Sequence, residues 1–130
     1  MANPKKLVLI VDDDVEYVES NQELLEASGY DVIAAYNGAE GLALAKTRKP
    51  DLMILDVMMA TNTEGFEIAR RIPHSAELKN MHVLLVTGIR KDMKLPVSFQ
   101  PDETWLPVDK VFEKPIDPQM LLDEIKKRIG

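Results

Sequence analysis

Short continuous runs of apolar residues alternate along the chain with longer stretches in which apolar residues recur at helical spacing. The runs cover residues 7–11, 31–35, 52–55, 82–87 and 110–112. A continuous apolar run of roughly four to eight residues is typical of a strand that is buried on both faces of a sheet. The pattern therefore predicts five strands, and each of the five gaps between and after them is long enough to hold a helix.

Helix signals fill three of these gaps. Asp14 predicts an N-cap for a helix that buries Val15, Val18 and Leu25, with Gln22 on the same side, and that stops at Gly29. The spacing predicts a second helix over 39–48, buried through Leu42 and Ala43, and a third over 64–72, with Phe66, Ala69 and Ile72 as core positions.

The last helix has clear start signals, because Asp117 can cap it and Pro118 can open it. Its expected core positions are Leu121, Leu122, Ile125 and Ile129. The region 88–109, by contrast, holds three prolines and shows no sustained helical period. We expect the fourth helix to be degenerate or replaced by a loop there.

Regular alternation of strands and helices predicts an α/β fold with a parallel sheet and helices on both faces. The common small arrangement is a flavodoxin-like, doubly wound, five-stranded sheet in the order 2-1-3-4-5. The first and third strands are then neighbours, and ligands bind beyond the carboxyl ends of the strands.

Polar residues fall where this fold predicts a site. Asp12 and Asp13 follow the first strand, Asp56 ends the third, Thr87 ends the fourth and Lys114 follows the fifth. Parallel strands bring these ends to one rim. Carboxylates gathered there repel one another, and a hard cation such as Mg²⁺, which prefers oxygen ligands, relieves that repulsion. A carboxylate beside Mg²⁺ and a lysine is a competent nucleophile toward phosphorus, and a threonine can hydrogen-bond the incoming oxygen.

Composition narrows the function further. The 130 residues carry a net charge of −6, which argues against direct binding to nucleic acid. The chain has no cysteine, which excludes disulfides, thiolate zinc sites and thiol catalysis and suits a cytoplasmic location. We expect no membrane insertion, because the apolar runs are too short to span a bilayer.

Four motifs in order resemble the receiver domain of bacterial two-component response regulators: Val11-Asp12-Asp13-Asp14, Leu55-Asp56-Val57-Met58-Met59, Val86-Thr87-Gly88 and Glu113-Lys114-Pro115. The resemblance covers nearly the whole chain. It implies that Asp56 accepts a phosphoryl group. It also implies that Asp13 binds Mg²⁺ directly with Asp56 and the Met58 carbonyl, while Asp12 acts through water.

The same resemblance implies that Thr87 binds the phosphoryl group as the switch residue and that Lys114 contacts the group from the other side. It implies a signalling protein rather than an enzyme, with only self-phosphorylation and slow self-dephosphorylation. A sensor histidine kinase or a histidine phosphotransfer protein would supply the phosphoryl group, and a further protein would receive the signal. We expect residues 1–130 to form a single receiver domain without an output domain.

The sequence departs from the receiver pattern at three places. Ala60 stands where a proline is usual, in a loop one residue longer than is typical. Val111 stands at the position of the switch aromatic, and Phe112 lies one place later. The segment 90–109 is long, is rich in proline and contains Phe99 and Trp105, so we expect it to dock a partner unless these rings pack inward.

Two other functions remain open on the sequence alone. A pseudo-receiver would bind a partner without phosphorylation, which the Val111 position favours and the intact acidic set opposes. A phosphohydrolase of the haloacid-dehalogenase type would use the Asp12-Asp13-Asp14 segment, but that class needs a second acidic pair well after its lysine. Few residues follow Lys114.

Overall fold

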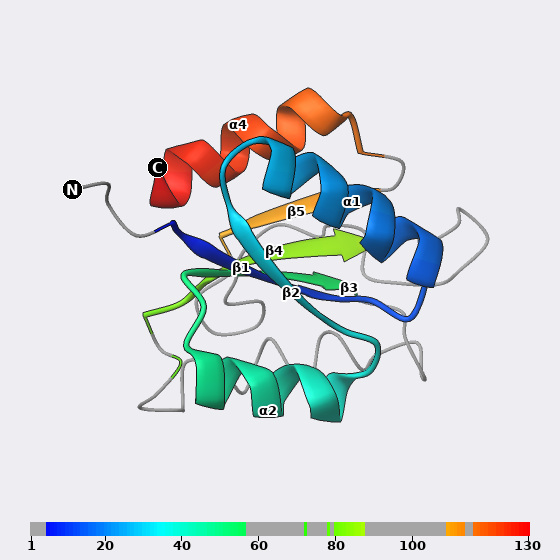
Figure 1. Cartoon of the computed structure of the whole chain (residues 1–130), viewed down its shortest axis with the longest axis vertical. Coiled ribbons are helices and arrows are strands. Elements are labelled where there is room, and N and C mark those ends of the chain that lie inside the picture. Colours follow the sequence, from blue (N-terminus) through cyan, green and yellow to red (C-terminus); the bar gives the residue numbers. More distant parts are fainter. Residues whose placement is uncertain (1–4, 57–71, 73–77, 79, 88–108, 114–115) are drawn as a thin grey trace.

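The computed structural model describes residues 5–56, 72, 78, 80–87, 109–113 and 116–130. Five parallel strands form one sheet in the order β2-β1-β3-β4-β5 (Figure 1). The strands are β1 (Leu7–Val11), β2 (Asp31–Ala35), β3 (Leu52–Asp56), β4 (His82–Thr87) and β5 (Lys110–Glu113). The predicted topology is confirmed, and each strand begins where its apolar run begins.

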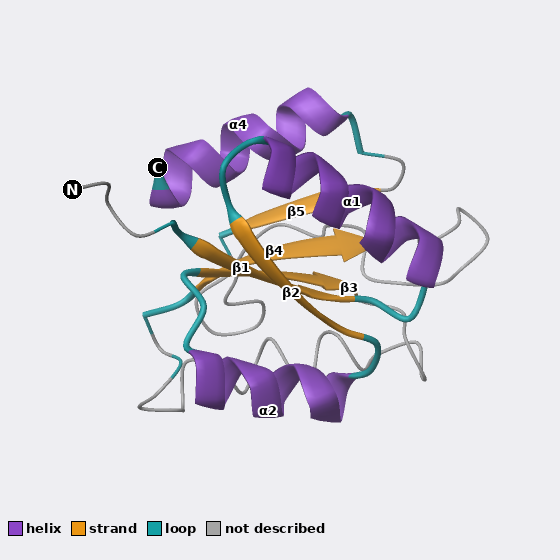
Figure 2. Cartoon of the chain, in the orientation of Figure 1, coloured by secondary structure: helices purple, strands orange, loops and turns teal. Residues whose placement is uncertain are grey.

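Helices cover both faces of this sheet. Helices α1 (Val15–Ala27) and α4 (Pro118–Ile129) lie on one face, and α2 (Gly38–Arg48) lies on the other (Figure 2). Alternate residues of β1, β3 and β4 point to opposite faces, so adjacent leucines such as Leu84 and Leu85 belong to different apolar clusters. The sheet is thus buried on both sides, as its continuous apolar runs require.

Cap geometry confirms the predicted starts of α1 and α4, and α2 begins one residue before its predicted start. The side chains of Asp14 and Asp117 accept hydrogen bonds from the first backbone N–H groups of α1 and α4. Asn37 caps α2 in the same way. Gly29 follows the end of α1 with a φ of 99°, a conformation in which glycine has no steric penalty.

Two of the predicted core positions are wrong. Val15 is 49% exposed, although Val18 and Leu25 of the same helix are fully buried. On α2, Ala43 is exposed and Leu42 only half-buried. The buried positions of α2 are the small residues Gly38, Gly41 and Ala45.

Other predicted core positions are confirmed. Leu121, Leu122 and Ile125 of α4 are buried, and Ile129 packs against the same cluster. Ile72 is also buried, while the rest of the predicted helix 64–72, including Phe66 and Ala69, lies outside the described residues. The region 88–108, where we expect a degenerate fourth helix, lies outside them as well.

Candidate functional site

Three carboxylates meet at the carboxyl edge of the sheet. Val11 of β1 pairs with Leu55 of β3, so the residues that follow them, Asp12 and Asp56, lie side by side. One carboxylate oxygen from each of Asp12, Asp13 and Asp56 lies within 4.8 Å of the others. Asp12 and Asp56 are 2% and 4% exposed, whereas Asp13 is open to solvent. The predicted acidic cluster is thus present at the predicted edge.

Backbone hydrogen bonds hold Asp12 in this position. Its N–H donates to the carbonyl oxygen of Ala35 at 3.1 Å, which continues the pairing of β1 with β2 by one residue. Its Oδ1 accepts the N–H of Asp14 at 2.9 Å. Asp14 in turn accepts the N–H of Tyr17 at 3.2 Å, so the loop and the first turn of α1 form one connected unit. Asp14 therefore acts as a helix cap, as predicted.

Tyr17 is a residue of this neighbourhood that the sequence analysis did not single out. Its hydroxyl oxygen is buried. Burial, and then the negative charge of Asp12, raise the pKa of the Tyr17 hydroxyl to about 12. The charges of Asp56 and Asp14 act in the same direction, while the Asn21 side chain lowers the pKa. The phenol therefore stays neutral beside the acidic cluster at physiological pH.

The other predicted site residues are described only in part. Thr87 is the last residue of β4, one position beyond Val86, which pairs with Asp56. The backbone of Thr87 thus reaches the same edge as the carboxylates. Lys114 follows Glu113, the partner of Thr87 in β5, and lies outside the described residues, as does Met58.

The switch position lies at the start of the described β5. Phe112 is 8% exposed and packs in the cluster beneath α1 and α4, while Val111 is half-buried against the opposite cluster. The two side chains therefore point to opposite faces of the sheet. Phe112 is a core residue here, and it does not take the place of an aromatic residue at position 111.

The donor set of this cluster fits a hard divalent cation. All three side chains offer oxygen, two of them are buried, and no Cys or His takes part in the grouping. Oxygen-only sites with one or two carboxylates are those in which Mg²⁺ keeps several of its waters. A cation held there would leave coordination positions for water or for a phosphoryl oxygen.

Comparison with known proteins agrees with this geometry. Residues 8–126 match the model of the response regulator receiver domain. The chain is 32% identical over 121 residues to the protein PilH of Pseudomonas aeruginosa, covering 91% of this chain and 93% of that protein. It is also 32% identical over 121 residues to the alkaline phosphatase synthesis transcriptional regulatory protein PhoP of Bacillus subtilis, but spans only 47% of its length.

Solved structures give the same result. The chemotaxis response regulator CheY4 of Vibrio cholerae superposes with a TM-score of 0.78 at 25% identity, covering 97% of this chain and 100% of that one. A CheY-like receiver domain from Methanospirillum hungatei gives a TM-score of 0.77 at 28% identity, covering 95% and 93%.

The fold and the acidic edge together define a phosphorylation-controlled signalling module of the two-component type. The chain belongs to the response regulator receiver domain family. This family is one of signalling modules rather than enzymes, which disfavours the phosphohydrolase interpretation. In the part of the chain that the structure describes, no helix has the length and apolar character needed to cross a bilayer.

Proposed function

We propose that this protein accepts a phosphoryl group on Asp56 with Mg²⁺ as cofactor, and that it signals through a partner protein. The observation that carries the proposal is the convergence of the Asp12, Asp13 and Asp56 carboxylate oxygens within 4.8 Å at the carboxyl edge of the sheet. The carboxylates of this cluster repel an anionic phosphoryl donor, because like charges repel at short range. A bound cation offsets that repulsion and allows the donor to approach.

Each residue has a distinct role in this proposal. Asp13, the exposed carboxylate, binds Mg²⁺ directly together with Asp56 and the Met58 carbonyl, and Asp12 acts through water. The Asp56 carboxylate oxygen attacks phosphorus while the bond from phosphorus to the donor breaks, so that an acyl phosphate forms and the donor leaves with the bonding electron pair. Thr87 and Lys114 contact the transferred phosphoryl oxygens.

The donor in this proposal is a sensor histidine kinase or a histidine phosphotransfer protein, as is general for receiver domains. The chain acts in the cytoplasm without contacting nucleic acid or inserting into membrane. Segment 90–109 is our proposed partner-docking surface, and only its last residue, Asp109, belongs to the described part.

Incubation with acetyl phosphate and Mg²⁺, followed by intact-mass measurement, tests the acceptor. We expect one added phosphoryl group that maps to Asp56 and that disappears when EDTA is present. The Asp56→Asn variant should show no adduct, because the amide oxygen is a far weaker nucleophile. Asp13→Asn should reduce the adduct and weaken its dependence on Mg²⁺.

Asp14→Asn supplies the matched control, since the residue adjoins Asp13 but caps α1 instead of joining the carboxylate cluster. Asparagine caps helices as well as aspartate does, so this variant should keep a full adduct. A phosphoryl group on another residue would contradict the assignment of Asp56. No adduct at all in the presence of Mg²⁺ would favour the pseudo-receiver, which the valine at position 111 also favours.

A further inference from the structure

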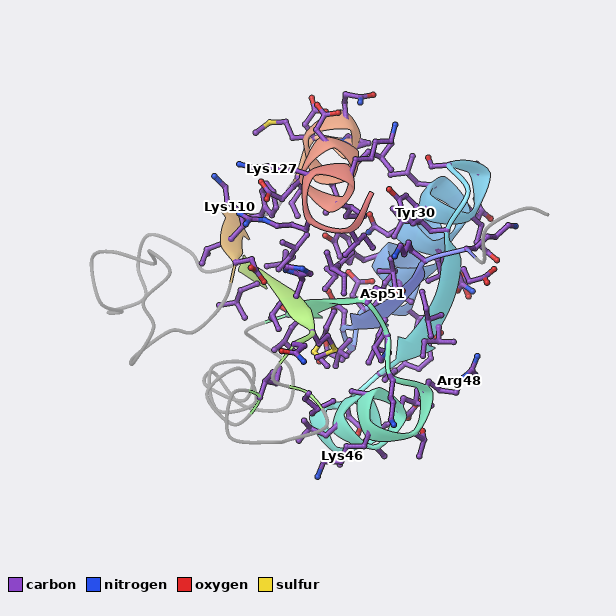
Figure 3. The ribbon with its side chains drawn as sticks, turned by 90° about the vertical axis from the view of Figure 1, so that its left-hand side faces the viewer. Tyr30, Lys46, Arg48, Asp51, Lys110 and Lys127 are labelled. Atoms are coloured by element: carbon purple, nitrogen blue, oxygen red, sulfur yellow. The ribbon has the colours of Figure 1, made fainter. Side chains whose placement is uncertain are left out.

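The basic residues of the described part gather at one end of the molecule. All nine of them lie just before a strand, at the first residue of a strand or at the end of a helix, at positions 5, 6, 46, 48, 49, 110, 126, 127 and 128. In a parallel α/β fold these positions share the amino edge of the sheet, opposite the acidic cluster. Figure 3 looks at this edge and shows Lys46 and Arg48 below Asp51, with Lys110 and Lys127 above it.

Helix dipoles explain only part of this arrangement. Cations in the last turn of α2 and α4 stabilise the partial negative charge there. Lys5, Lys6 and Lys110, however, precede or open strands, and the positive end of a strand dipole does not attract cations. Their presence adds positive charge to this edge, which also carries the carboxylates of Asp31, Asp51 and Asp109, in a chain whose net charge is −6.

A cavity of about 430 Å³ opens in the middle of this edge. Lys6, Lys49, His82 and Arg128 give it a basic rim, and Met81 and Ile129, which are both half-buried, contribute the apolar part of its lining. Its volume lies within the range of small-molecule sites, roughly 300–1,000 Å³. Cations at a rim above an apolar surface are suited to a ligand that has both an anionic group and an apolar ring.

The charged groups at the rim differ in whether they are free to contact a ligand. Arg128 is committed within the protein: its Nε donates to Glu124 at 2.6 Å and its Nη2 to the Asp109 carbonyl at 3.3 Å. Asp51 also lines the cavity, but its Oδ2 accepts the N–H of Leu7 at 2.8 Å. Among the described residues, no ion pair involves the ammonium groups of Lys6 or Lys49. These two lysines are the available cations.

Lys49 also has an unusual backbone. It is the only described non-glycine residue with positive φ, at φ 48° and ψ 62°, as the C-cap of α2. Glycine is preferred at this position because it has no Cβ, and a longer residue held there costs free energy. Glycine would cap the helix equally well, but it would remove an ammonium group from the cavity rim.

We propose that this cavity binds a small phosphorylated metabolite of about nucleotide size, with Lys6 and Lys49 contacting the phosphate groups. The apolar side chains of Met81 and Ile129 pack against the ring. The site lies at the sheet edge opposite the phosphorylation site, and it is independent of the function proposed above. A bound ligand would join the starts of β1, β3 and β4 to the end of α4, so it would also stabilise the fold by mass action.

Isothermal titration with ADP, in EDTA to exclude metal binding at the carboxylate cluster, tests this proposal. We expect saturable binding of one ADP, weaker binding of pyrophosphate and no detectable binding of adenosine. The double variant Lys6→Gln/Lys49→Gln should weaken ADP binding by roughly tenfold or more, because two charge-assisted contacts are lost. ADP should raise the melting temperature of the parent and not that of this variant.

Lys46→Gln/Lys127→Gln is the matched control. It removes the same charge from the same edge, but neither residue lines the cavity. Its ADP affinity should change by less than about twofold, as expected for screened charges at a distance. If Lys49→Gln impairs folding, two single variants replace the double variant. Lys6→Gln should weaken ADP binding, and Lys49→Arg should retain the ADP affinity of the parent.

Several outcomes would overturn the proposal. Equal weakening by both double variants would mean a diffuse basic surface without a site. Loss of ADP binding in Asp56→Asn would place the ligand at the opposite edge. Absence of saturation at millimolar ADP would exclude the metabolite, and binding of phosphatidylglycerol vesicles under those conditions would assign the edge to an anionic membrane surface instead.

Discussion

The Asp109 carboxylate contacts residues of β4 and α4. Its Oδ2 accepts the N–H of Val83 at 2.8 Å, and its Oδ1 lies 3.3 Å from His82 Nδ1 and 3.9 Å from Arg128 Nη1. Its own N–H donates to the Val83 carbonyl at 2.8 Å. The start of β5 is thereby fixed to the start of β4 and to the end of α4.

Asp109→Ala should therefore lower the free energy of unfolding by about 1–3 kcal/mol, because it leaves a part-buried backbone N–H without its acceptor. Urea denaturation followed by circular dichroism measures the loss. Asp123→Ala serves as control, since Asp123 is exposed and, within the described part of the chain, accepts only from the side chain of Gln119 on the same helix. That control should shift stability by no more than about 0.5 kcal/mol. Equal losses in the two variants would refute this role of Asp109.

Tyr17 predicts a pH dependence of stability. Its pKa is raised from 10.0 to about 12 by burial and neighbouring carboxylates, so the folded state keeps the phenol proton more tightly than the unfolded state does. The stabilisation is complete below pH 10 and is lost as the pH rises toward 12. Solvent around the partly exposed ring reduces the size of this effect.

Between pH 10 and pH 12, the parent protein in EDTA should lose more stability than Tyr17→Phe, which cannot ionise. Urea midpoints at a series of pH values measure the difference. Tyr36→Phe is the matched control, because Tyr36 is 38% exposed. Its curve should follow that of the parent. If Tyr17→Phe also follows the parent, ionisation of Tyr17 is not coupled to folding.

At the scale of elements, the close approach of α2 to β1 depends on Gly41. A Cβ atom at this position would lie 2.8 Å from Cγ2 and 2.9 Å from Cγ1 of Val11, closer than real contacts allow. The helix can therefore approach the sheet this closely only because position 41 has no side chain.

Gly41→Ala should destabilise the protein by about 1 kcal/mol. Overpacking costs about 1–3 kcal/mol, and the better helix propensity of alanine offsets up to about 1 kcal/mol. Ala43→Gly, at an exposed site of the same helix, measures the propensity contribution separately. In a Val11→Ala background the Gly41→Ala change should become neutral or stabilising, because the clashing methyl groups are gone. An unchanged cost in that background would exclude Val11 as its cause.

The elements that the structure describes were predictable from the sequence, but the orientations of the helices were only partly so. A strand that is buried on both faces is predicted from its apolar run alone, because the side chains on both of its faces are apolar. A helix, however, must be assigned a buried stripe, and residues three apart differ by about 60° around its axis. Val15 lies off the line of Val18 and Leu25, and Ala43 lies opposite Gly41.

The same reasoning explains what was predicted of the sites. Asp12, Asp13 and Asp56 were found because strand ends share one edge whatever the packing details. Tyr17 was missed because its place beside the cluster depends on the rotation of α1. The cavity at the amino edge has no motif, since its lining comes from separate segments that only the folded sheet brings together.

At the scale of the whole molecule, one sheet joins two apolar layers. Leu84 and Leu85 are both fully buried, and they belong to the clusters on opposite faces of β4. Since β1, β3 and β4 contribute to both clusters, loss of packing on one face weakens strands that the other face needs. We expect the two layers to unfold together.

Leu84→Ala and Leu85→Ala should each cost about 2–5 kcal/mol, the usual range for such cavities. In both variants the slope of the free energy of unfolding against denaturant concentration should equal that of the parent. The transitions followed by near-UV and far-UV circular dichroism should coincide. Ala43→Gly provides a solvent-exposed comparison with a loss of only about 1 kcal/mol. A transition that separates into two steps in either variant would mean that the layers unfold independently.

Among the described residues, the carboxylate cluster lies at one edge of the sheet and the nine basic residues lie at the other, and this separation along the strand direction contributes an electric dipole. A dipole in the field of a charged body experiences a torque, so the molecule turns before it makes contact. An anionic surface selects the amino edge and leaves Asp56 facing the solution. A cationic surface selects the carboxyl edge and covers Asp56. The sign of the charge on the approaching body thus decides which face is presented at encounter.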